Sequence, residues 1–344
     1  MISVIIVNYN VKYFLERSLL AVREALVCEP GEIIVFDNAS ADGSKEYLEP
    51  KFPEVRFIWN DENLGFGRAN NKAWKQAKGN IILFLNPDTL IGRKCLSNTA
   101  GFLRSKEEAG ALGIRMINGS GRFLKESKRG YPTVMTSFYK LCGLSSLFPR
   151  SSVFARYYLG HLDPDQTQEI DVLAGAFMMV KREVLEKTGG FDEDFFMYGE
   201  DIDLSYRIQQ LGYKNYYFAD DTIVHFKGES TRRDSLNYIR MFYSAMIIFV
   251  RKHYKGIPAI LLRTCLYIAI SVRAVVALFS LFLHRFFPSK ERFKPMNKKR
   301  LVMVGEQEDA DCVSTLFTFD QQSDSTELLP RIPSKKIRNV LSRG

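Results

Sequence analysis

The sequence contains few cysteines, and none of them is placed as a pair. Its five cysteines are scattered over 344 residues, and no two form a C-x-x-C pair. A disulfide framework or a structural zinc site needs cysteines in closer, even-numbered groups, so the sequence indicates neither. The cysteine content therefore favours a reducing compartment.

Signals for export and for a simple membrane span are also missing. The N-terminus, MISVIIVNYN, has no basic residue ahead of its short apolar run, which is typical of a buried strand rather than a signal peptide. The most apolar segment, residues 257–287, is interrupted by Arg263 and Arg273. No unbroken apolar run reaches the roughly 18 residues that a spanning helix needs. We therefore expect the functional part of the protein to lie in the cytoplasm.

Acidic residues are scarce in one part of the chain. Residues 226–300 contain 16 Lys and Arg against 3 Asp and Glu, a net charge of +13, whereas the whole chain carries +9. Basic residues interleaved with apolar ones predict an anionic partner, and the amount of apolar sequence favours a membrane surface over nucleic acid. No motif of a nucleic-acid-binding module occurs either.

The C-terminal region divides into two parts. Residues 231–300 predict a basic helical segment, amphipathic and apolar, that associates with the membrane and begins with a helix at 236–253. An interfacial helix, a hairpin and a single span all fit its pattern. Residues 301–344 begin like a strand, a glycine turn and a helix, which we interpret as a partial βα-like unit followed by a flexible tail.

The first 90 residues alternate short apolar runs with polar, helix-compatible segments. This pattern predicts an α/β fold that is Rossmann-like, with a mostly parallel sheet flanked by helices. We expect its strands at residues 3–8, 32–37, 55–60 and 81–86, each followed by a polar cluster: NYN, DNAS, NDEN and NPD. Ligands bind beyond the carboxyl ends of such strands, so four clusters predict one composite site, although any one alone would be an ordinary turn.

The rest of this domain extends to about residue 230. An irregular stretch, residues 117–170, has no clear period, and we expect it to contribute contacts to an acceptor molecule. Beyond it, two short strands are expected near residues 215–218 and 223–226, with a polar break between them.

The segment LFLNPDTL predicts a cation site. Asp88 follows a buried strand, and Asn86 stands two positions earlier, so a carboxylate and an amide lie on the same side of the chain. Mg²⁺ or Mn²⁺ needs few protein oxygens when substrate phosphates supply the others. The alternative interpretation is an Asn-Pro-Asp turn in which Asp88 caps a helix.

Two other strand ends predict a nucleotide pocket. Asp37 ends the strand IIVFDN, where its carboxylate can accept hydrogen bonds from ribose hydroxyls or a base N–H. In NDENLGFGRANNKAW, Gly65 lets the backbone approach a ligand closely, Arg68 offers a planar guanidinium for phosphate, and Asn63 flanks the loop. Turn formation is the competing explanation for Asp37.

The segment GEDIDLSYR places Glu200, Asp201 and Asp203 in the first turn of an expected helix. The helix dipole stabilises acidic side chains at this end and could explain them without any function. Asp203 is expected to pair with Arg207, four residues along the helix.

Taken together, these motifs resemble a known family. SVIIVNYN, VFDNASADGS, LNPD, GAFMMVKR, GGFDEDFFMYGEDIDLSYR and IVHFKGES follow one another across residues 1–230. In that order they resemble the family 2 glycosyltransferases of the GT-A fold, particularly the bacterial rhamnosyltransferase-like branch. The resemblance implies an inverting glycosyltransferase that uses a nucleotide-diphosphate sugar and a divalent metal ion, Mg²⁺ or Mn²⁺.

The resemblance also implies roles for individual residues. The residues expected to bind the nucleotide-sugar donor are Asn8, Asn10, Asp37, Asn63, Gly65, Arg68 and Asn86. Asp88 matches the last acid of the family's D-x-D motif, whose first position is Asn86 here, and His225 matches a second metal or diphosphate contact. Lys227, Ser230 and Arg232 would face the diphosphate. Asp201 would be the catalytic base, and Glu200 would orient the acceptor.

We therefore expect transfer of a sugar, such as rhamnose or another deoxyhexose, to a lipid-linked glycan acceptor in surface polysaccharide synthesis. The basic C-terminal segment would hold the enzyme at the cytoplasmic face of the inner membrane. A metal-dependent nucleotidyltransferase and a non-catalytic protein that binds nucleotide sugars are the alternatives.

Overall fold

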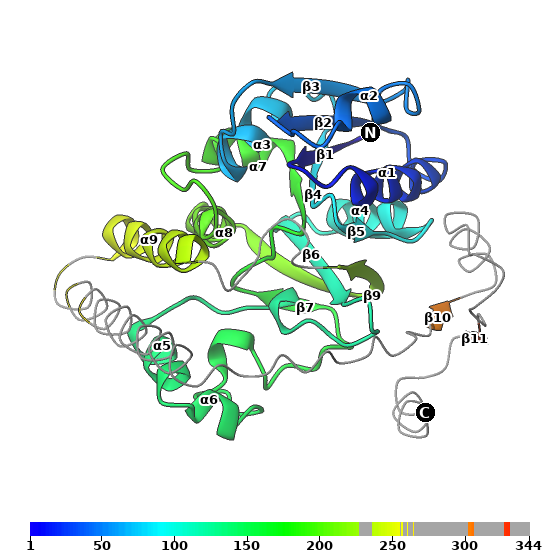
Figure 1. Cartoon of the computed structure of the whole chain (residues 1–344). Helices are drawn as coiled ribbons and strands as arrows, with labels where there is room; N and C mark the ends of the chain where they lie inside the picture. The colour runs from blue at the N-terminus through cyan, green and yellow to red at the C-terminus, as the bar shows by residue number, and fades with distance from the viewer. Residues whose placement is uncertain are drawn as a thin grey trace, which may run out of the picture.

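The computed structural model describes residues 1–226 and 236–254, the single residues 256, 260 and 264, and two short strands farther along the chain. Figure 1 shows a twisted sheet with helices on both sides. The four strands expected from the N-terminal pattern are confirmed: β1 (Ile2–Asn8), β2 (Gly31–Asn38), β3 (Arg56–Asn60) and β4 (Ile81–Leu85). They pair in parallel in the order β3-β2-β1-β4.

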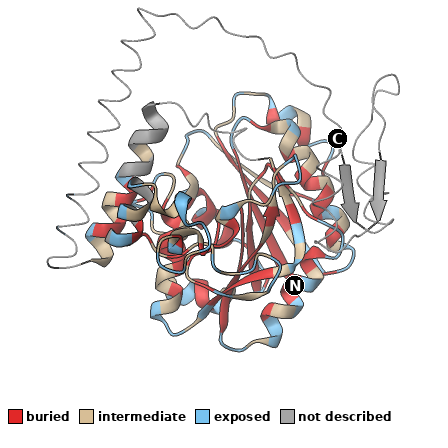
Figure 2. Ribbon diagram, turned by 90° about the horizontal axis from the view of Figure 1, so that it is seen from below, coloured by how far each residue is buried: buried red, intermediate tan, exposed pale blue. Residues whose placement is uncertain are grey.

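The alternation of side chains along β1 explains why helices cover both faces. Ile2, Val4 and Ile6 belong to one core cluster, whereas Ile5 and Val7 belong to the other. The first cluster includes buried residues of α1 (Lys12–Leu26) and α4 (Cys95–Ser105), and α2 (Ser44–Leu48) joins it through Leu48. The second includes residues of α3 (Phe66–Trp74), α7 (Arg182–Thr188) and α8 (Glu200–Gln210). In Figure 2 the buried residues concentrate along the sheet between these layers.

The second half of the sheet is mixed in direction. β8 (Phe177–Lys181) runs antiparallel between β4 and β6 (Ala109–Ile117), and β9 (Lys214–His225) runs parallel to β6. The short strands β5 (Thr89–Leu90) and β7 (Gln168–Ile170) pair antiparallel with β9. The expectation of two strands near residues 215–226 is wrong, because β9 is one strand whose pairing with β6 shifts register between Ile114 and Arg115.

Between β6 and β7 the chain forms an insertion, residues 118–167. It contains η1 (Lys125–Ser127), α5 (Val134–Leu141), α6 (Leu144–Leu147) and η2 (Arg156–Tyr158). In Figure 1 the helices α5 and α6 lie at the end of the molecule opposite β3.

Helix α9 (Leu236–His253) confirms the helix expected at 236–253. This helix falls in the segment that we expected to associate with the membrane, yet its Ala245 and Phe249 are buried against Ile202 of α8 and Phe195. Figure 1 shows α9 alongside α8. Among the described residues, no helix combines the length and apolarity that a membrane crossing requires.

The remaining described strands are β10 (Val302–Gly305) and β11 (Glu327–Pro330), which pair in parallel. Most of the expected membrane segment, residues 257–300, and most of the expected flexible tail lie outside the described residues.

Candidate functional site

The ends of β1 and β2 bring two of the predicted donor-binding residues together. Asn8 Nδ2 donates a hydrogen bond to Asp37 Oδ2 at 2.7 Å, and further bonds to Ser40 Oγ at 3.1 Å and Ser44 Oγ at 3.0 Å. Asp37 Oδ1 accepts a hydrogen bond from the backbone N–H of Ser40 at 2.8 Å. Both Asn8 and Asp37 are buried, and Asn8 Oδ1 has no partner within the described part of the chain. An acceptor oxygen without a partner at this edge is suited to a ligand N–H or hydroxyl.

Asn10 lies at the same edge and shapes the loop around it. Its backbone has a positive φ of 56°, and its Oδ1 accepts a hydrogen bond from Ala41 N at 2.7 Å. Its own N–H donates to Ser40 Oγ at 2.9 Å. The side chain therefore fixes the loop that follows β2, beside the Asn8–Asp37 pair.

The loop before α3 is closely packed against the backbone of the acidic segment. Asn63 Oδ1 accepts a hydrogen bond from Gly65 N at 2.9 Å, and Gly65 has a φ of 80°. A Cβ atom at Gly65 would lie 2.3 Å from the carbonyl oxygen of Phe196. The N–H of the next residue, Phe66, donates to that same oxygen at 2.9 Å. The close approach that requires glycine here is thus to the protein's own backbone.

Two other side chains complete this loop. Arg68 is largely exposed, and its Nε lies 3.7 Å from Glu193 Oε2, so the guanidinium lies at the surface of the protein. Asn38, which the sequence motifs did not single out, accepts a hydrogen bond from Leu64 N at 2.9 Å and donates to Gly65 O at 3.1 Å. The available signal was the Asp37-Asn38 pair at the end of β2, because the side-chain amide of an asparagine can both donate and accept hydrogen bonds.

Asp88 and His225 meet although 137 residues separate them. Thr89 of β5 pairs with His225 of β9, and this pairing places His225 Nε2 at 3.3 Å from Asp88 Oδ1. Both side chains are buried, and His225 Nδ1 has no partner among the described residues. Asp88 is followed by the strand β5 rather than by a helix, so it does not cap a helix.

The surroundings of this pair decide what it could hold. Asn86 is partly buried, and its backbone N–H donates to Ala176 O at 3.0 Å. In the described ranges, no three His, Cys, Asp or Glu side chains gather as they would in an all-protein metal site. One carboxylate and one imidazole fit a divalent ion whose other ligands are phosphate or water oxygens. Lys227, Ser230 and Arg232, expected near the diphosphate, lie outside the described residues.

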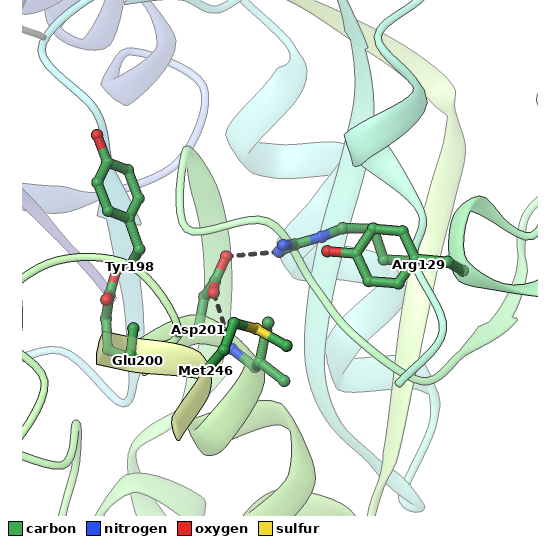
Figure 3. Close-up of a pocket in the computed structure, with 9 residues that line it drawn as sticks. Arg129, Tyr198, Glu200, Asp201 and Met246 are labelled. Carbon is green, nitrogen blue, oxygen red and sulfur yellow. Dashed lines mark hydrogen bonds and ion pairs between the residues drawn. The ribbon is translucent and has the colours of Figure 1, made fainter. Parts of the chain in front are cut away.

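A pocket of about 90 Å³ surrounds the acidic end of α8. Its walls come from the insertion, from the first turn of α8 with the two residues before it, and from helix α9. The side chains that line it include Arg129, Tyr157, Tyr198, Glu200, Asp201 and Met246. Figure 3 shows the Asp201 carboxylate and the Arg129 guanidinium pointing toward each other in this pocket.

Asp201 is held by a buried ion pair. Its Oδ2 accepts hydrogen bonds from Arg129 at 2.5 Å and from Gly175 N at 3.2 Å, and its Oδ1 accepts one from Ile202 N at 2.8 Å. Burial lowers the pKa of Arg129, but the Asp201 carboxylate beside it outweighs burial, so that the net change in the Arg129 pKa is upward. Arg129 also donates to Leu173 O at 2.6 Å, which fixes the guanidinium. Sequence motifs missed Arg129 because it lies in the irregular insertion.

Glu200, the neighbouring carboxyl group, has the opposite environment. It is buried, and its Oε2 has no hydrogen-bond partner in the described part of the chain. Burial, followed by repulsion from Asp201, raises the pKa of Glu200 to about 8. At neutral pH Glu200 therefore carries a proton and can donate a hydrogen bond into the pocket.

Asp203 is not among the residues that line the pocket, and it joins three helices. Its side chain is fully buried, and Arg207 Nε donates to Asp203 Oδ2 at 2.7 Å, which confirms the predicted pair. Arg207 also donates to Thr188 O at 2.6 Å, at the end of α7. On the other side, His253 Nε2 of α9 lies 2.6 Å from Asp203 Oδ1. Nothing in the sequence pattern predicted the contact with His253.

The chain is similar in sequence to known glycosyltransferases. The family described as Glycosyl transferase family 2 matches residues 3–189. N-acetylglucosaminyl-diphospho-decaprenol L-rhamnosyltransferase of Mycobacterium tuberculosis is 26% identical over 266 residues, which cover 74% of this chain and 85% of that protein. Rhamnosyltransferase WbbL of Escherichia coli K12 is 27% identical over 180 residues, which cover 49% of this chain and 63% of that protein.

Solved structures share the fold at lower identity. The mannosyltransferase PcManGT from Pyrobaculum calidifontis, in complex with GDP-Man and Mn²⁺, superposes with a TM-score of 0.50 at 18% identity, covering 83% of this chain and 81% of that one. GalNAc-T7 with UDP, GalNAc and Mn²⁺ gives a TM-score of 0.50 at 20% identity, and the match spans 70% of this chain and about half, 47%, of GalNAc-T7.

Proposed function

The chain belongs to glycosyl transferase family 2 and has a GT-A-like α/β fold, and from that premise we propose that it is an inverting glycosyltransferase. Its donor is a nucleotide-diphosphate sugar, such as a rhamnose or another deoxyhexose donor, and its acceptor is a lipid-linked glycan. The observation that carries this proposal is the pocket in which Asp201, paired with Arg129, lies beside the buried carboxyl group of Glu200. The rhamnosyltransferase from Mycobacterium tuberculosis, whose name includes a diphospho-decaprenol acceptor, supports this class of substrate.

The donor occupies the carboxyl edge of β1 to β4 in this proposal. Asn8 and Asp37 meet the nucleoside, and Arg68 reaches the pocket from α3. Asp88 and His225 would hold a divalent ion, Mg²⁺ or Mn²⁺, together with the donor diphosphate. When bound, the ion would neutralise the charge that develops on the leaving nucleotide.

Inversion requires the acceptor hydroxyl to attack the anomeric carbon from the face opposite the leaving nucleotide. A carboxylate beside that hydroxyl takes its proton as the new bond forms. Asp201 suits this role because Arg129 and the backbone N–H of Gly175 both donate hydrogen bonds to Oδ2 and so fix the orientation of the carboxyl group. Its Oδ1 accepts one backbone N–H and has a second lone pair for the incoming proton.

Glu200 orients the acceptor in this scheme. Because its pKa is about 8, the carboxyl group is protonated at neutral pH and donates to the acceptor oxygen, whose own proton then faces Asp201. The two neighbouring acids thus have different roles because their surroundings differ: Asp201 has an ion pair, whereas Glu200 is buried with one oxygen that lacks a hydrogen-bond partner in the described part of the chain.

The change Asp201→Asn tests the assignment. We expect sugar transfer to fall about 10²- to 10⁴-fold, the usual contribution of a general base, while the affinity for the nucleotide-sugar donor stays within a factor of about two. Asp220→Asn, at an exposed carboxylate on β9, is the matched control and should leave transfer unchanged. An Asp201→Asn protein that still transfers sugar at the parent rate would refute the role of Asp201.

The same assay separates the proposed reaction from its alternatives. Release of nucleoside diphosphate from the donor, stimulated by an acceptor lipid, is expected of a glycosyltransferase. Release of pyrophosphate from a nucleoside triphosphate would indicate a nucleotidyltransferase instead. Donor binding without any release, across a panel of nucleotide sugars with Mg²⁺ and Mn²⁺, would indicate a binding protein.

Association of residues 257–300 with the cytoplasmic face of the inner membrane is a further part of the proposal. It is supported by the basic and apolar composition of this segment. Deleting these residues should shift the protein from the membrane fraction to the soluble fraction of a cell lysate. A shortened protein that still fractionates wholly with membranes would refute the role of this segment.

A further inference from the structure

The insertion exposes a cluster of large apolar side chains. These side chains are between 46% and 70% exposed and belong to α5, α6 and the turn after them: Met135, Phe138, Leu147, Phe148 and Val153. They are five of the twelve exposed large apolar residues found among the described residues, yet they lie within 19 residues of sequence. We call these five residues the insertion patch. Such a concentration is unusual for a surface that contacts only water.

The charge around the insertion patch has one sign. No Asp or Glu occurs between Glu126 and Asp163, whereas five Lys and Arg residues do, and two of them, Arg150 and Arg156, are exposed. Apolar side chains flanked by basic ones, with no acidic residue, are complementary to a bilayer that contains anionic lipids. A protein partner would not require the complete absence of acidic residues over such a length.

The insertion patch and the pocket belong to one continuous piece of structure. Phe148 and Tyr139 both pack on Phe154, with ring centroids 5.3 and 5.0 Å apart. Phe154 precedes η2, which supplies Tyr157 to the pocket and is in contact with α5. At the other end of the insertion, Arg129 holds Asp201. The insertion patch is therefore connected to the lining of the pocket through Phe154 and η2.

We propose that the insertion patch docks on an anionic bilayer surface and so presents the pocket to acceptors embedded in that bilayer. The helices α5 and α6 are short, so they lie at the interface with their apolar side chains among the headgroups and upper acyl chains. This docking does not involve residues 257–300. The binding to the bilayer stands on its own, whereas the presentation of the pocket to an acceptor rests on the proposed function.

The chain contains its own reporter position for this docking. Cys142 is exposed between Phe138 and Leu147 in the sequence, whereas Cys28 is exposed between α1 and β2, outside the insertion. In a full-length protein with the other accessible cysteines changed to serine, a polarity-sensitive fluorophore at Cys142 should brighten and shift to the blue with vesicles of phosphatidylglycerol and phosphatidylcholine. The same fluorophore at Cys28 is the matched control, and its spectrum should not change.

Substitution of the insertion patch gives the second arm. Phe138→Ser, Leu147→Ser and Phe148→Ser together should weaken partition of the full-length protein onto these vesicles by at least about tenfold, because less apolar surface enters the interface. Transfer to a water-soluble acceptor analogue should be unchanged. The control protein with Val27→Ser and Leu211→Ser, two exposed apolar residues elsewhere, should partition like the parent.

The outcomes distinguish the explanations. An unchanged Cys142 signal on vesicles, or parent-like partition of the triple variant, overturns the docking proposal. A Cys142 signal that rises with protein concentration without vesicles also overturns it, because the insertion patch then contacts a second copy of the chain. Vesicle docking without sugar transfer from any donor would instead refute the proposed function and leave the docking surface intact.

Discussion

The buried carboxyl group of Glu200 should make the stability of the protein depend on pH. Its pKa is raised from 4.5 to about 8, so between these two pH values the folded protein holds a proton that the unfolded chain has lost. The folded state binds more protons, and its free energy of unfolding must therefore fall as the pH rises through this window. Each pKa unit corresponds to about 1.4 kcal/mol, so the full loss by pH 8 is roughly 5 kcal/mol.

The change Glu200→Gln removes this contribution while keeping the shape of the side chain. We expect the variant and the parent to have similar stability near pH 4.5. The variant should become progressively more stable than the parent up to pH 8, by roughly 3 to 5 kcal/mol. Urea unfolding, followed by tryptophan fluorescence at intervals of half a pH unit, measures the difference. Taking the difference between the two proteins removes the contributions of all other titrating groups.

The control is Glu107→Gln, at an exposed carboxyl group. Its difference from the parent should stay within about 0.5 kcal/mol at every pH. A difference between Glu200→Gln and the parent that is flat from pH 5 to pH 8 would refute the reasoning. It would mean that Glu200 is ionised in the folded protein at neutral pH and cannot donate a hydrogen bond to an acceptor.

Three further predictions follow from other contacts. Arg129→Met should lower the free energy of unfolding by about 3 to 5 kcal/mol. The double variant with Asp201→Asn should lose about 1 to 3 kcal/mol less than the sum of the two single changes, and additivity within about 0.5 kcal/mol would contradict a coupled ion pair. Gly65→Ala should destabilise the folded protein by about 2 to 4 kcal/mol. The control is Gly121→Ala, which should cost clearly less, because Gly121 has a similar φ of 74° but open space around it. Equal effects of the two changes in urea unfolding would show that no clash occurs at Gly65. Asp88→Asn should weaken the binding of a nucleoside diphosphate in the presence of Mn²⁺ by at least about tenfold, but should change its binding in EDTA little. Calorimetry measures both affinities, and an equal loss in the two conditions would argue against a metal-binding role of Asp88.

The N-terminal half of the fold could be predicted because its strands are short, apolar and separated by polar clusters. β1 is buried at every position, and parallel strands covered by helices on both faces have this continuous apolar pattern. β9 could not be predicted as one strand, because Ala219 to Thr222 interrupts its apolar pattern. These residues are partly or fully exposed, so they continue the strand without needing apolar side chains.

The sequence predicted several residues of the candidate site, but it did not predict the contacts between them. Asp88 and His225 were each singled out by motif, but the pairing of β5 with β9 that joins them depends on sheet register, which no local pattern encodes. Arg129 lies in a segment without period, and its role depends on the tertiary fold. The assignment of Gly65 to ligand contact was made from residue type, whereas the packing of Phe196 explains it physically.

The buried Asp203 also determines how this half of the protein opens. It contacts His253, the last residue of α9, and its partner Arg207 donates to the end of α7. Lys252 of α9 also forms ion pairs with Asp192 and Asp194, in the loop between α7 and α8. Detaching α9 alone would remove His253 from the buried Asp203 carboxylate, so transient opening should be shared by all three helices. Their slowest amide hydrogens should therefore exchange at one common rate, and the acidic end of α8 behaves as part of a cooperative unit rather than as the edge of a loop.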